Sequence, residues 1–420
     1  MLEKHSVCCP YIIVHFWKAP FCYHLYCSII VRFLQYKMQF LPFTFQKVYF
    51  IMIVVKNIFK GADRMKRLNI AIIGQGRSGK DIHGKYYRSE DNQYYLVKYV
   101  VDADEFRRKV SESIYPDCKT LADYTELYAF NDIDLVVNAT YSEMHYSITK
   151  DLLLHGKNVL VEKPFGRSRY ECDELMKIAK EQGVTLAVFQ QTFLAPFYQF
   201  AYDTISSGRL GDIKQINIRY NGFSRRWDWQ TLQKKCAGST YNTGPHPIGM
   251  ALGFLDFDKD AKVLYSKLDT ALTSGDADDY AKILITAPNK PLIDIEISAI
   301  DAYTDYNIKV QGTKGTLKAT PKSYEMTYIQ DGENPERPVV EEFLKDADGN
   351  PMYCSEKLIK HIESDKFVGT AFDIGTAKLY EQLYYKLAEG RDMTVTPEMA
   401  ARIISVIETV HAQNPLPLKY

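Results

Sequence analysis

The sequence predicts an α/β protein: first a doubly wound parallel sheet of the Rossmann type, then an α+β domain with a large, mainly antiparallel open sheet. Three observations predict this. From residue 68 onward, short apolar runs alternate with helix-like stretches, which is typical of parallel βαβ units. A cluster of glycines directly follows the first apolar run. After about residue 212, strand-like alternation prevails and few helices intervene.

The parallel part should contain buried strands with helices between them. The apolar runs cover residues 68–73, 96–101, 133–138, 158–161 and 184–189. Helix-like stretches cover 145–156 and 168–182, and Gly156 and Gly183 stand where helix C-caps are expected. We place this first domain at residues 65–190.

The second domain, residues 191–420, should combine strands with a helical tail. Alternating strands are expected at 213–220, 262–268, 280–286, 292–298, 307–311 and 316–319. Gly312-Thr313-Lys314-Gly315 is typical of a hairpin turn. Helices follow at about 368–389 and 397–412, and we expect them to pack back on the first domain.

The composition is that of an ordinary globular protein, with 46% hydrophobic and 25% charged residues among 420. Basic and acidic residues balance at 52 each, so the chain offers no electrostatic case for a nucleic-acid or membrane partner. The cysteines after residue 64 are scattered without metal-ligand spacing. This predicts reduced thiols, a cytoplasmic location and no metal site.

Residues 1–64 differ from the rest, since they hold eight Lys and Arg but two acids, which leaves the remainder with a net charge of −6. Basic residues interrupt every apolar stretch before it reaches the roughly 18 residues of a membrane span. We expect a non-native or disordered leader, with translation starting at Met65, because Lys60-Gly61-Ala62 can be encoded by a bacterial ribosome-binding sequence. The alternative is a membrane-attached extension.

Gly74-Gln75-Gly76-Arg77-Ser78-Gly79 lies between a predicted strand and a predicted helix. This is the G-x-G-x-x-G pattern of dinucleotide-binding loops. Its first glycine permits a tight turn, its second lets a pyrophosphate approach the backbone, and its third allows close packing of the helix. The alternative is a glycine turn without a ligand.

Asp102 ends the next predicted strand, 23 residues after Gly79. An acid at about this spacing accepts hydrogen bonds from the ribose hydroxyls and repels a 2′-phosphate. NAD is therefore the expected cofactor, although Arg107 and Arg108 follow closely and leave NADP open.

Glu162-Lys163-Pro164 stands at the carboxyl end of a predicted strand, where open α/β sheets bind ligands. The proline stops the strand, so Lys163 can project into a crevice. An oxidised nicotinamide and partial burial would lower the pKa of Lys163 toward neutrality, so that it takes a hydroxyl proton as the hydride leaves. The alternative is a surface Lys–Glu pair.

Asn242-Thr243-Gly244-Pro245-His246 places a histidine in a glycine-broken turn. If this stretch enters a helix, Asn242 and His246 share a face, and a histidine titrates in the range of a proton relay. The alternative is a hydrogen-bonded turn histidine. Nearby, the segment Arg225-Arg226-Trp227-Asp228-Trp229-Gln230 offers paired donors and aromatic faces that suit a sugar ring, with Arg226 and Trp227 as the expected contacts, or else its tryptophans pack in a domain interface.

Over residues 68–412 the chain resembles the Gfo/Idh/MocA family of glucose–fructose oxidoreductase and inositol dehydrogenase. The resemblance rests on a combination of short motifs: the glycine loop followed by His83, Asp102, Thr140 with His145, Gly156-Lys157-Asn158-Val159 leading into Glu162-Lys163-Pro164, Pro196, Ser207-Gly208-Arg209-Leu210-Gly211, Asn242 to His246, and the Gly312 hairpin.

The resemblance implies an enzyme that oxidises or reduces a sugar or cyclitol carbon with NAD(P). It implies that Lys163 and His246 are catalytic and that Asn242 assists them. By the same resemblance, Thr140, His145, Glu162 and Gln191 join the glycine loop as cofactor contacts, and Tyr241 helps to position substrate. By analogy with relatives we expect a homodimer or homotetramer.

The chain departs from the family pattern at four places. Asn242 replaces a frequent aspartate, Gly249 replaces another, Tyr141-Ser142 stands for a Pro-Asn pair, and Gln191-Thr192 stands for an Asn-Arg pair. An amide accepts no proton, so proton transfer falls on Lys163.

Three hypotheses follow. The first is an NAD-dependent oxidoreductase acting on a secondary hydroxyl or ketone of a sugar, glycoside or cyclitol. The second keeps NAD bound and cleaves a glycosidic bond through a transient 3-keto sugar, with no net redox change. The third is a non-catalytic NAD-binding sensor, which the departures at Asn242 and Gly249 suggest.

Overall fold

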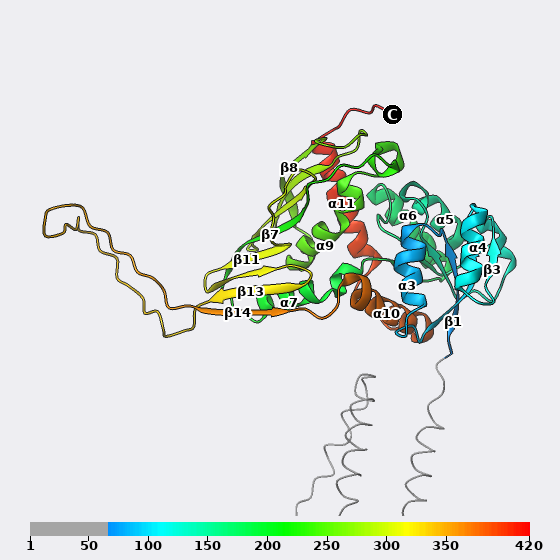
Figure 1. The fold of residues 1–420 in the computed structure, drawn as a ribbon, viewed down its shortest axis with the longest axis horizontal. Helices are drawn as coiled ribbons and strands as arrows, with labels where there is room; N and C mark the ends of the chain where they lie inside the picture. The colour runs from blue at the N-terminus through cyan, green and yellow to red at the C-terminus, as the bar shows by residue number, and fades with distance from the viewer. Residues whose placement is uncertain (1–65) are drawn as a thin grey trace, which may run out of the picture. The chain divides into compact units, whose positions relative to one another are not determined.

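The computed structural model describes residues 66–420, drawn as a ribbon in Figure 1. The predicted leader and the proposed start at Met65 lie outside the described residues. Within the described part, no helix is long and apolar enough to cross a membrane.

The first sheet has six parallel strands in the order β3-β2-β1-β4-β5-β6, which is the doubly wound order. The strands are β1 (Leu68–Ile73), β2 (Tyr95–Val101), β3 (Lys119–Leu121), β4 (Leu135–Asn138), β5 (Val159–Val161) and β6 (Leu186–Val188). The central strand β4 is buried at all its residues, as expected for a sheet covered on both faces.

Helices α3 (Gly84–Tyr87), α4 (Glu105–Ile114), α5 (His145–Leu154) and α6 (Arg169–Gln182) connect these strands. Local sequence sets the limits of α6. The side chain of Ser168 accepts a hydrogen bond from the Glu171 amide at its start, and Gly183 takes a left-handed conformation, with φ +65°, at its end.

The second sheet has eight strands in the order β14-β13-β12-β11-β7-β10-β9-β8. Its strands are β7 (Ile213–Asn221), β8 (Lys262–Asp269), β9 (Tyr280–Thr286), β10 (Leu292–Ser298), β11 (Ile308–Gly312), β12 (Gly315–Ala319), β13 (Ser323–Tyr328) and β14 (His361–Lys366). All neighbours pair antiparallel except β7 and β10. Together the two sheets confirm the predicted fold class.

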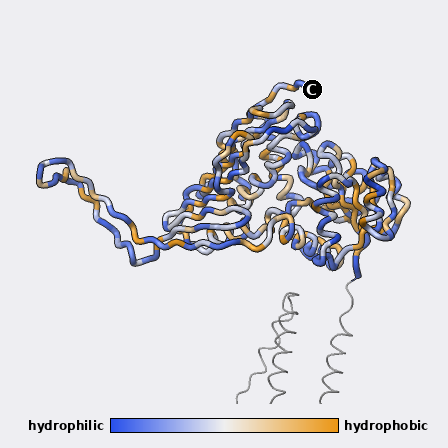
Figure 2. Tube along the Cα trace, viewed as in Figure 1, coloured by the Kyte–Doolittle hydropathy of each residue, from blue (hydrophilic) through white to orange (hydrophobic). Residues whose placement is uncertain are grey.

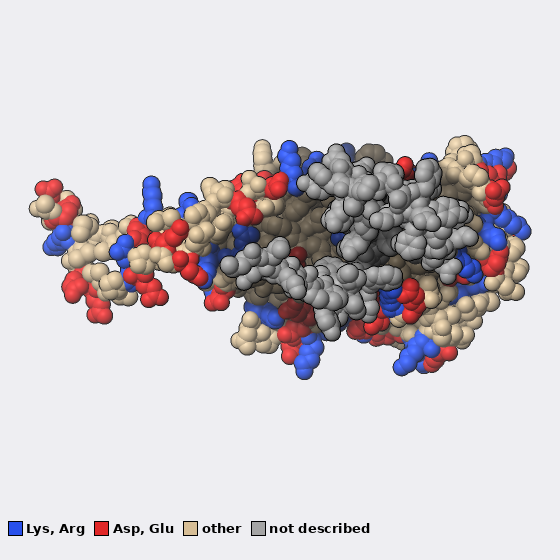
Figure 3. Space-filling view, turned by 90° about the horizontal axis from the view of Figure 1, so that it is seen from below, with Lys and Arg blue, Asp and Glu red and all other residues tan. Residues whose placement is uncertain are grey.

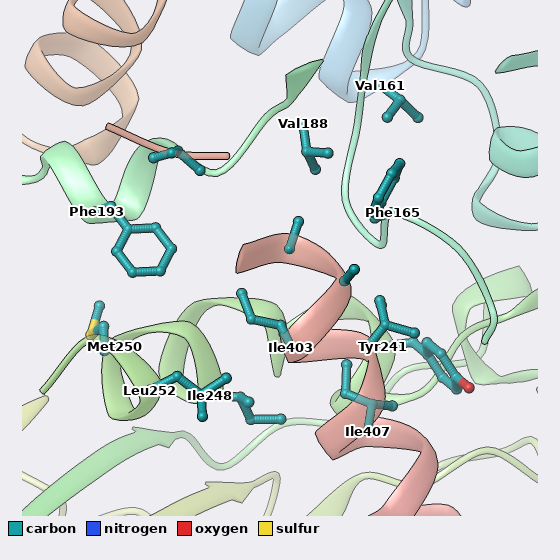
Figure 4. Close-up of a cluster of buried hydrophobic side chains, with 14 of the residues drawn as sticks. Val161, Phe165, Val188, Phe193, Tyr241, Ile248, Met250, Leu252, Ile403 and Ile407 are labelled. Carbon is teal, nitrogen blue, oxygen red and sulfur yellow. The ribbon is translucent and has the colours of Figure 1, made fainter. Parts of the chain in front are cut away.

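Helices α7 (Pro196–Ser206), α9 (Pro245–Phe254) and α11 (Pro397–Gln413) lie on one face of the second sheet (Figure 1). The burial of β9 alternates residue by residue, because no helix of residues 66–420 covers its other face. One apolar core joins the two halves of the protein: Figure 4 shows Ile403 and Ile407 of α11 between Val188 of the first sheet and Ile248 of α9. The boundary at residues 190 and 191 stays a prediction.

Helix α10 (Thr376–Glu389) packs on the first sheet, where Tyr380 and Leu383 share a core with Ile70 and Val100. It begins later than the predicted residue 368, because a π-helical turn with Thr370 as its N-cap precedes it. The sequence prediction lacked β3, β13 and β14. The first is a three-residue strand, and β14 is largely exposed, so neither shows a clear apolar pattern.

Candidate active site

The glycine loop follows β1 at the carboxyl edge of the first sheet. Gly74 has φ +89° and its amide donates to the carbonyl of Val101 at 2.8 Å. A Cβ on Gly79 would lie 1.8 Å from the Gly74 oxygen, so this position admits no side chain. A Cβ on Gly76 would meet no described atom within 4 Å, so the loop is open where a pyrophosphate is expected to approach. Arg77 and Ser78 begin the helical segment after it.

Asp102, directly after β2, lies against this loop. Its Oδ2 accepts a hydrogen bond from the Gln75 amide at 2.7 Å, and its Oδ1 accepts one from the Asp104 amide at 2.9 Å. The Nη1 of Arg107 lies 3.6 Å from Oδ2, whereas Arg108 donates to the carbonyl oxygen of Asp102 at 2.7 Å. Arg108 is therefore engaged by the backbone, and Arg107 is the cation beside the carboxylate.

His145 joins the turn after β4 to the turn after β5. One ring nitrogen, Nδ1, hydrogen-bonds to the Pro164 oxygen at 2.8 Å, and Nε2 lies 3.2 Å from the Thr140 oxygen. Thr140 donates from Oγ1 to Asn138 at 2.7 Å. Burial lowers the pKa of His145, and its hydrogen bonds to the Pro164 and Thr140 oxygens oppose this. The structure places His145 as a support of the turn that carries Lys163, and its role as a cofactor contact stays a prediction.

Glu162 is a buried carboxylate with a full set of partners. Its Oε1 lies 3.1 Å from Nε2 of His83, and its Oε2 accepts the Lys163 amide at 3.0 Å. Nδ1 of His83 hydrogen-bonds in turn to the Tyr380 hydroxyl of α10 at 2.8 Å. Burial alone would raise the pKa of Glu162, but the hydrogen bond and charge of His83 and the charge of Lys163 lower it to about 2. A fixed negative charge therefore stands directly beside Lys163.

Lys163 lies two residues after the end of β5, and its side chain reaches into the second domain. Its Nζ donates to the main-chain oxygen of Asn242 at 2.8 Å and lies 3.5 Å from the Asn242 Oδ1. Burial lowers the pKa of Lys163, Glu162 opposes this, and the charges of Arg77 and Arg226 lower it further. A lysine with this environment releases and takes up a proton more readily than a solvated one.

His246 lies in the first turn of α9. Its Nδ1 hydrogen-bonds to the Thr192 hydroxyl at 2.6 Å, and its ring stacks near Tyr220 with 6.4 Å between ring centroids. Burial, together with the positive charge of Lys163, lowers the pKa of His246 to about 3. The imidazole is therefore neutral at physiological pH. The chain breaks between α8 (Ser239–Asn242) and α9, which begins at Pro245, so Asn242 and His246 do not share one helix face. Gly244 lies in this break and approaches Thr240 too closely for any side chain.

Two predicted substrate residues lie away from this group. Tyr241 is buried in the core beside His411, and its hydroxyl donates to the Arg167 oxygen at 2.7 Å, so it is positioned by packing rather than turned to the site (Figure 4). Trp227 is 77% exposed on a loop. Arg226 pairs with Asp228 at 3.6 Å and is near enough to Lys163 to affect its pKa.

Further residues lie around this group. Gln230 lies within 3.4 Å of the Asn242 side chain, and Trp229 packs edge-on against Tyr141 with 5.0 Å between ring centroids. Gln230 and Trp229 belong to the segment 225–230, which the sequence suggested as a sugar contact. Thr192 holds His246, and sequence reasoning missed it as a site residue because it stood out only as a departure from the family pattern.

Two buried glutamine oxygens indicate that the site fits a dinucleotide. The Oε1 atoms of Gln75 and Gln191 are buried and have no hydrogen-bond partner among the described residues. Buried polar atoms normally have a hydrogen-bond partner, so each of these two oxygens can accept a hydrogen bond from a polar group of a bound molecule. Gln75 belongs to the glycine loop, and Gln191 follows β6 at the same edge of the sheet.

This combination of doubly wound sheet, glycine loop and strand-end acid defines a dinucleotide-binding oxidoreductase. The chain belongs to the Gfo/Idh/MocA family, as its resemblance predicted. Residues 68–190 match the oxidoreductase family with an NAD-binding Rossmann fold, and residues 198–318 match the GFO/IDH/MocA C-terminal domain. NAD binding is thereby confirmed as a property of the first domain's family.

Curated relatives are distant. The scyllo-inositol 2-dehydrogenase (NADP(+)) IolW of Bacillus subtilis is 27% identical over 205 residues, which cover 48% of this chain and 56% of that protein. The 2,7-anhydro-N-acetylneuraminate hydratase of Mediterraneibacter gnavus is 24% identical over 263 residues, covering 60% and 67%. The match thus spans little more than half of the dehydrogenase's length.

Solved structures share the fold along nearly their whole length. GenD2 from gentamicin A biosynthesis, in complex with NAD, has a TM-score of 0.65 at 20% identity, covering 84% of this chain and 95% of GenD2. The putative oxidoreductase YvaA of Bacillus subtilis has a TM-score of 0.69 at 18% identity, covering 83% and 96%.

Proposed function

We propose that the chain is an NAD-dependent dehydrogenase acting on a secondary hydroxyl or ketone of a sugar, glycoside or cyclitol. The observation that carries this is the Nζ of the half-buried Lys163, held 2.8 Å from the Asn242 oxygen at the edge of the sheet that bears the glycine loop. The inositol dehydrogenase among the relatives supports the substrate class.

When bound, NAD supplies the hydride acceptor, and the chain supplies binding and proton transfer. The glycine loop, Asp102 and Gln191 would hold the cofactor. Lys163 in its amine form takes the hydroxyl proton as the carbon gives up its hydride, and Glu162 stabilises the ammonium that results. His246 is neutral and Thr192 holds one of its nitrogens, so the other nitrogen can hydrogen-bond to the reacting oxygen.

A screen of sugars, cyclitols and glycosides for NAD reduction tests this proposal. We expect turnover with at least one compound. In Lys163→Met turnover should fall by roughly 10²–10⁴-fold, the range of a lost general base, while NAD still binds. Lys177→Met, which changes an exposed lysine of α6, is the matched control. Undiminished turnover in Lys163→Met would show that another group carries the proton.

A second candidate recycles NAD within each turnover, and the hydratase among the relatives favours it. In that case a glycoside or anhydro-sugar is converted without NADH accumulating. Chromatography of the products beside the absorbance assay separates the two reactions. Binding of NAD without turnover of any compound would favour the sensor hypothesis.

A further inference from the structure

Residues 329–360 form a long arm between β13 and β14 that projects away from the second sheet (Figure 1). The arm is held by its own contacts: the Met352 amide donates to the Leu344 oxygen at 2.9 Å, and Arg337 pairs with Glu356 at 2.6 Å. Within the arm, Lys345 and Pro351 form an isolated antiparallel bridge, and no strands pair along residues 329–360. A segment with so little internal pairing is at best marginally stable by itself in water. Packing against another surface would therefore stabilise the arm.

The arm exposes large apolar side chains. Phe343 is 99% exposed and Tyr353 is 87% exposed, and Val339, Met352, Leu358 and Ile359 are exposed as well. Figure 2 shows these hydrophobic stretches along the arm. Contiguous exposed apolar surface of this kind marks an interaction site.

A second exposed apolar group, which we name the rim patch, lies past the ends of β7 and β10. It consists of Phe223, Trp227, Ile300 and Tyr303, of which Tyr303 is 93% exposed. Phe223 and Ile300 are joined by an antiparallel bridge, and Trp227 and Tyr303 follow each of them within four residues of the chain.

The arm and the rim patch lie at opposite ends of the same sheet. Tyr328, where the arm begins, pairs with Gly315, and Gly312 pairs with Ile213 at the start of β7. The rim patch follows Asn221 at the other end of β7, nine residues or roughly 30 Å away. The arm of one chain thus points away from its own rim patch.

We propose that the arm docks on the rim patch of a second copy of this chain, and that the second copy returns the same contact. A two-fold axis that sets the strands of two copies antiparallel brings each arm root beside the other's rim patch, which is a closed, self-complementary arrangement. Burying both apolar groups removes on the order of 1,000 Å² per contact, and two contacts reach the size of a stable interface.

Charge adds to this complementarity. The arm holds eight acidic and four basic residues, and Figure 3 shows acidic side chains along the projecting arm. The acids of the rim patch loops are already engaged: Asp228 lies 3.6 Å from Arg226, Asp305 pairs with Lys318 at 3.0 Å, and Asp301 accepts hydrogen bonds from Asn221 and the Tyr303 amide. Arg225 has no ion-pair partner among the described residues and is the cation beside Trp227 that an acidic arm would meet.

Cys354, an exposed thiol on the arm, allows a direct test. In the Tyr303→Cys variant of the full chain, a short bismaleimide should link Cys354 of one copy to position 303 of another. Mixed isotope-labelled and unlabelled protein and peptide mass spectrometry would identify the link between copies, and the Cys354→Ser background should lose it. The matched control is Tyr170→Cys, which changes another exposed tyrosine, 72% exposed, on α6. Equal linking in the control, links within one chain, or links from Cys354 to cysteines of residues 1–65 would overturn the proposal.

Phe343→Asp gives an independent measurement. Light scattering over a concentration series should show a dimer whose dissociation constant rises at least tenfold in this variant. Phe106→Asp, an exposed phenylalanine on α4, should leave it unchanged. A chain that is monomeric throughout, or a Phe343→Asp variant that dimerises as tightly as the unchanged chain, would contradict the proposal.

Discussion

The ammonium nitrogen of Lys163 donates a hydrogen bond to the main-chain oxygen of Asn242, 2.8 Å away, whereas the Asn242 side-chain oxygen is 3.5 Å away. The lysine is therefore positioned by backbone, which any residue at 242 supplies. This explains how an amide can stand where relatives often have a carboxylate without displacing the lysine.

Asn242→Asp should move the pH dependence of oxidation. A carboxylate 3.5 Å from Nζ stabilises the ammonium and raises the pKa of Lys163. Because oxidation needs the amine form, the rising limb of kcat/KM should shift to higher pH by about one unit. A pH profile of kcat/KM with the substrate found in the screen measures this shift. Gln230→Glu places a second carboxylate beside the Asn242 side chain and should shift the profile in the same direction. An unmoved profile would mean that Lys163 does not limit the reaction.

Gly76→Ala should separate cofactor binding from folding. Gly76 has φ −73° and open space beside it, so alanine should change the free energy of unfolding by less than about 0.5 kcal/mol. The affinity for NAD should fall on the order of tenfold, equivalent to about 1.4 kcal/mol, because the methyl group occupies the phosphate approach. Calorimetric titration and urea unfolding measure the two effects.

Gly79→Ala is the contrasting variant, since its Cβ would lie 1.8 Å from the Gly74 oxygen. It should cost about 1–3 kcal/mol of unfolding free energy as well as cofactor affinity. If Gly76→Ala and Gly79→Ala behaved alike in both measurements, the proposed division of roles within the loop would be wrong.

Asp102→Asn should shift cofactor preference toward NADP. Asparagine can still accept the Gln75 amide at the position of Oδ2, but it removes the charge that repels a 2′-phosphate. Arg107 then keeps only its contact with Asp104 at 3.8 Å and can meet a 2′-phosphate. We expect the ratio of kcat/KM for NADP over NAD to rise about tenfold or more. Adding Arg107→Ala to Asp102→Asn should reverse part of the gain in NADP preference. If Asp102→Asn left the ratio unchanged, Asp102 would not contact the adenosine ribose.

Glu162→Gln should remove a pH-dependent part of stability. The pKa of Glu162 is lowered in the folded chain to about 2 from an ordinary value of 4.5, so its contribution is complete above pH 4.5 and is lost as the pH falls toward 2. Urea unfolding of the unchanged chain should therefore weaken more steeply across that interval than unfolding of the variant. If the unfolding free energies of the unchanged chain and the variant fell in parallel with pH, the buried pair of Glu162 and His83 would not contribute this pH dependence. Glu181→Gln, which changes an exposed glutamate of α6, is the control.

The short motifs could be predicted because their chemistry is local. Gly74, Gly76 and Gly79 adopt a loop that their own backbone requires, and Asp102 and Lys163 follow apolar runs that can only be buried strands. Parallel strands end at one edge of a sheet, so the sequence alone predicted that these residues would meet there.

The partners of those residues depended on tertiary structure. Thr192 and His246 are 54 residues apart and Lys163 and Asn242 are 79 apart, and no periodicity relates them. Tyr241 and Asn242 are neighbours on one short helix that point to different sides, and packing of α8 against His411 decides which one faces the site.

By itself the sequence determined the fold class, the family and the cofactor loop, because strand burial and glycine geometry are set within a few residues. Only the tertiary structure decided which side chains surround Lys163 and where the arm of residues 329–360 projects. Those outcomes depend on which distant surfaces are buried together, and burial is a property of the assembled core rather than of any segment.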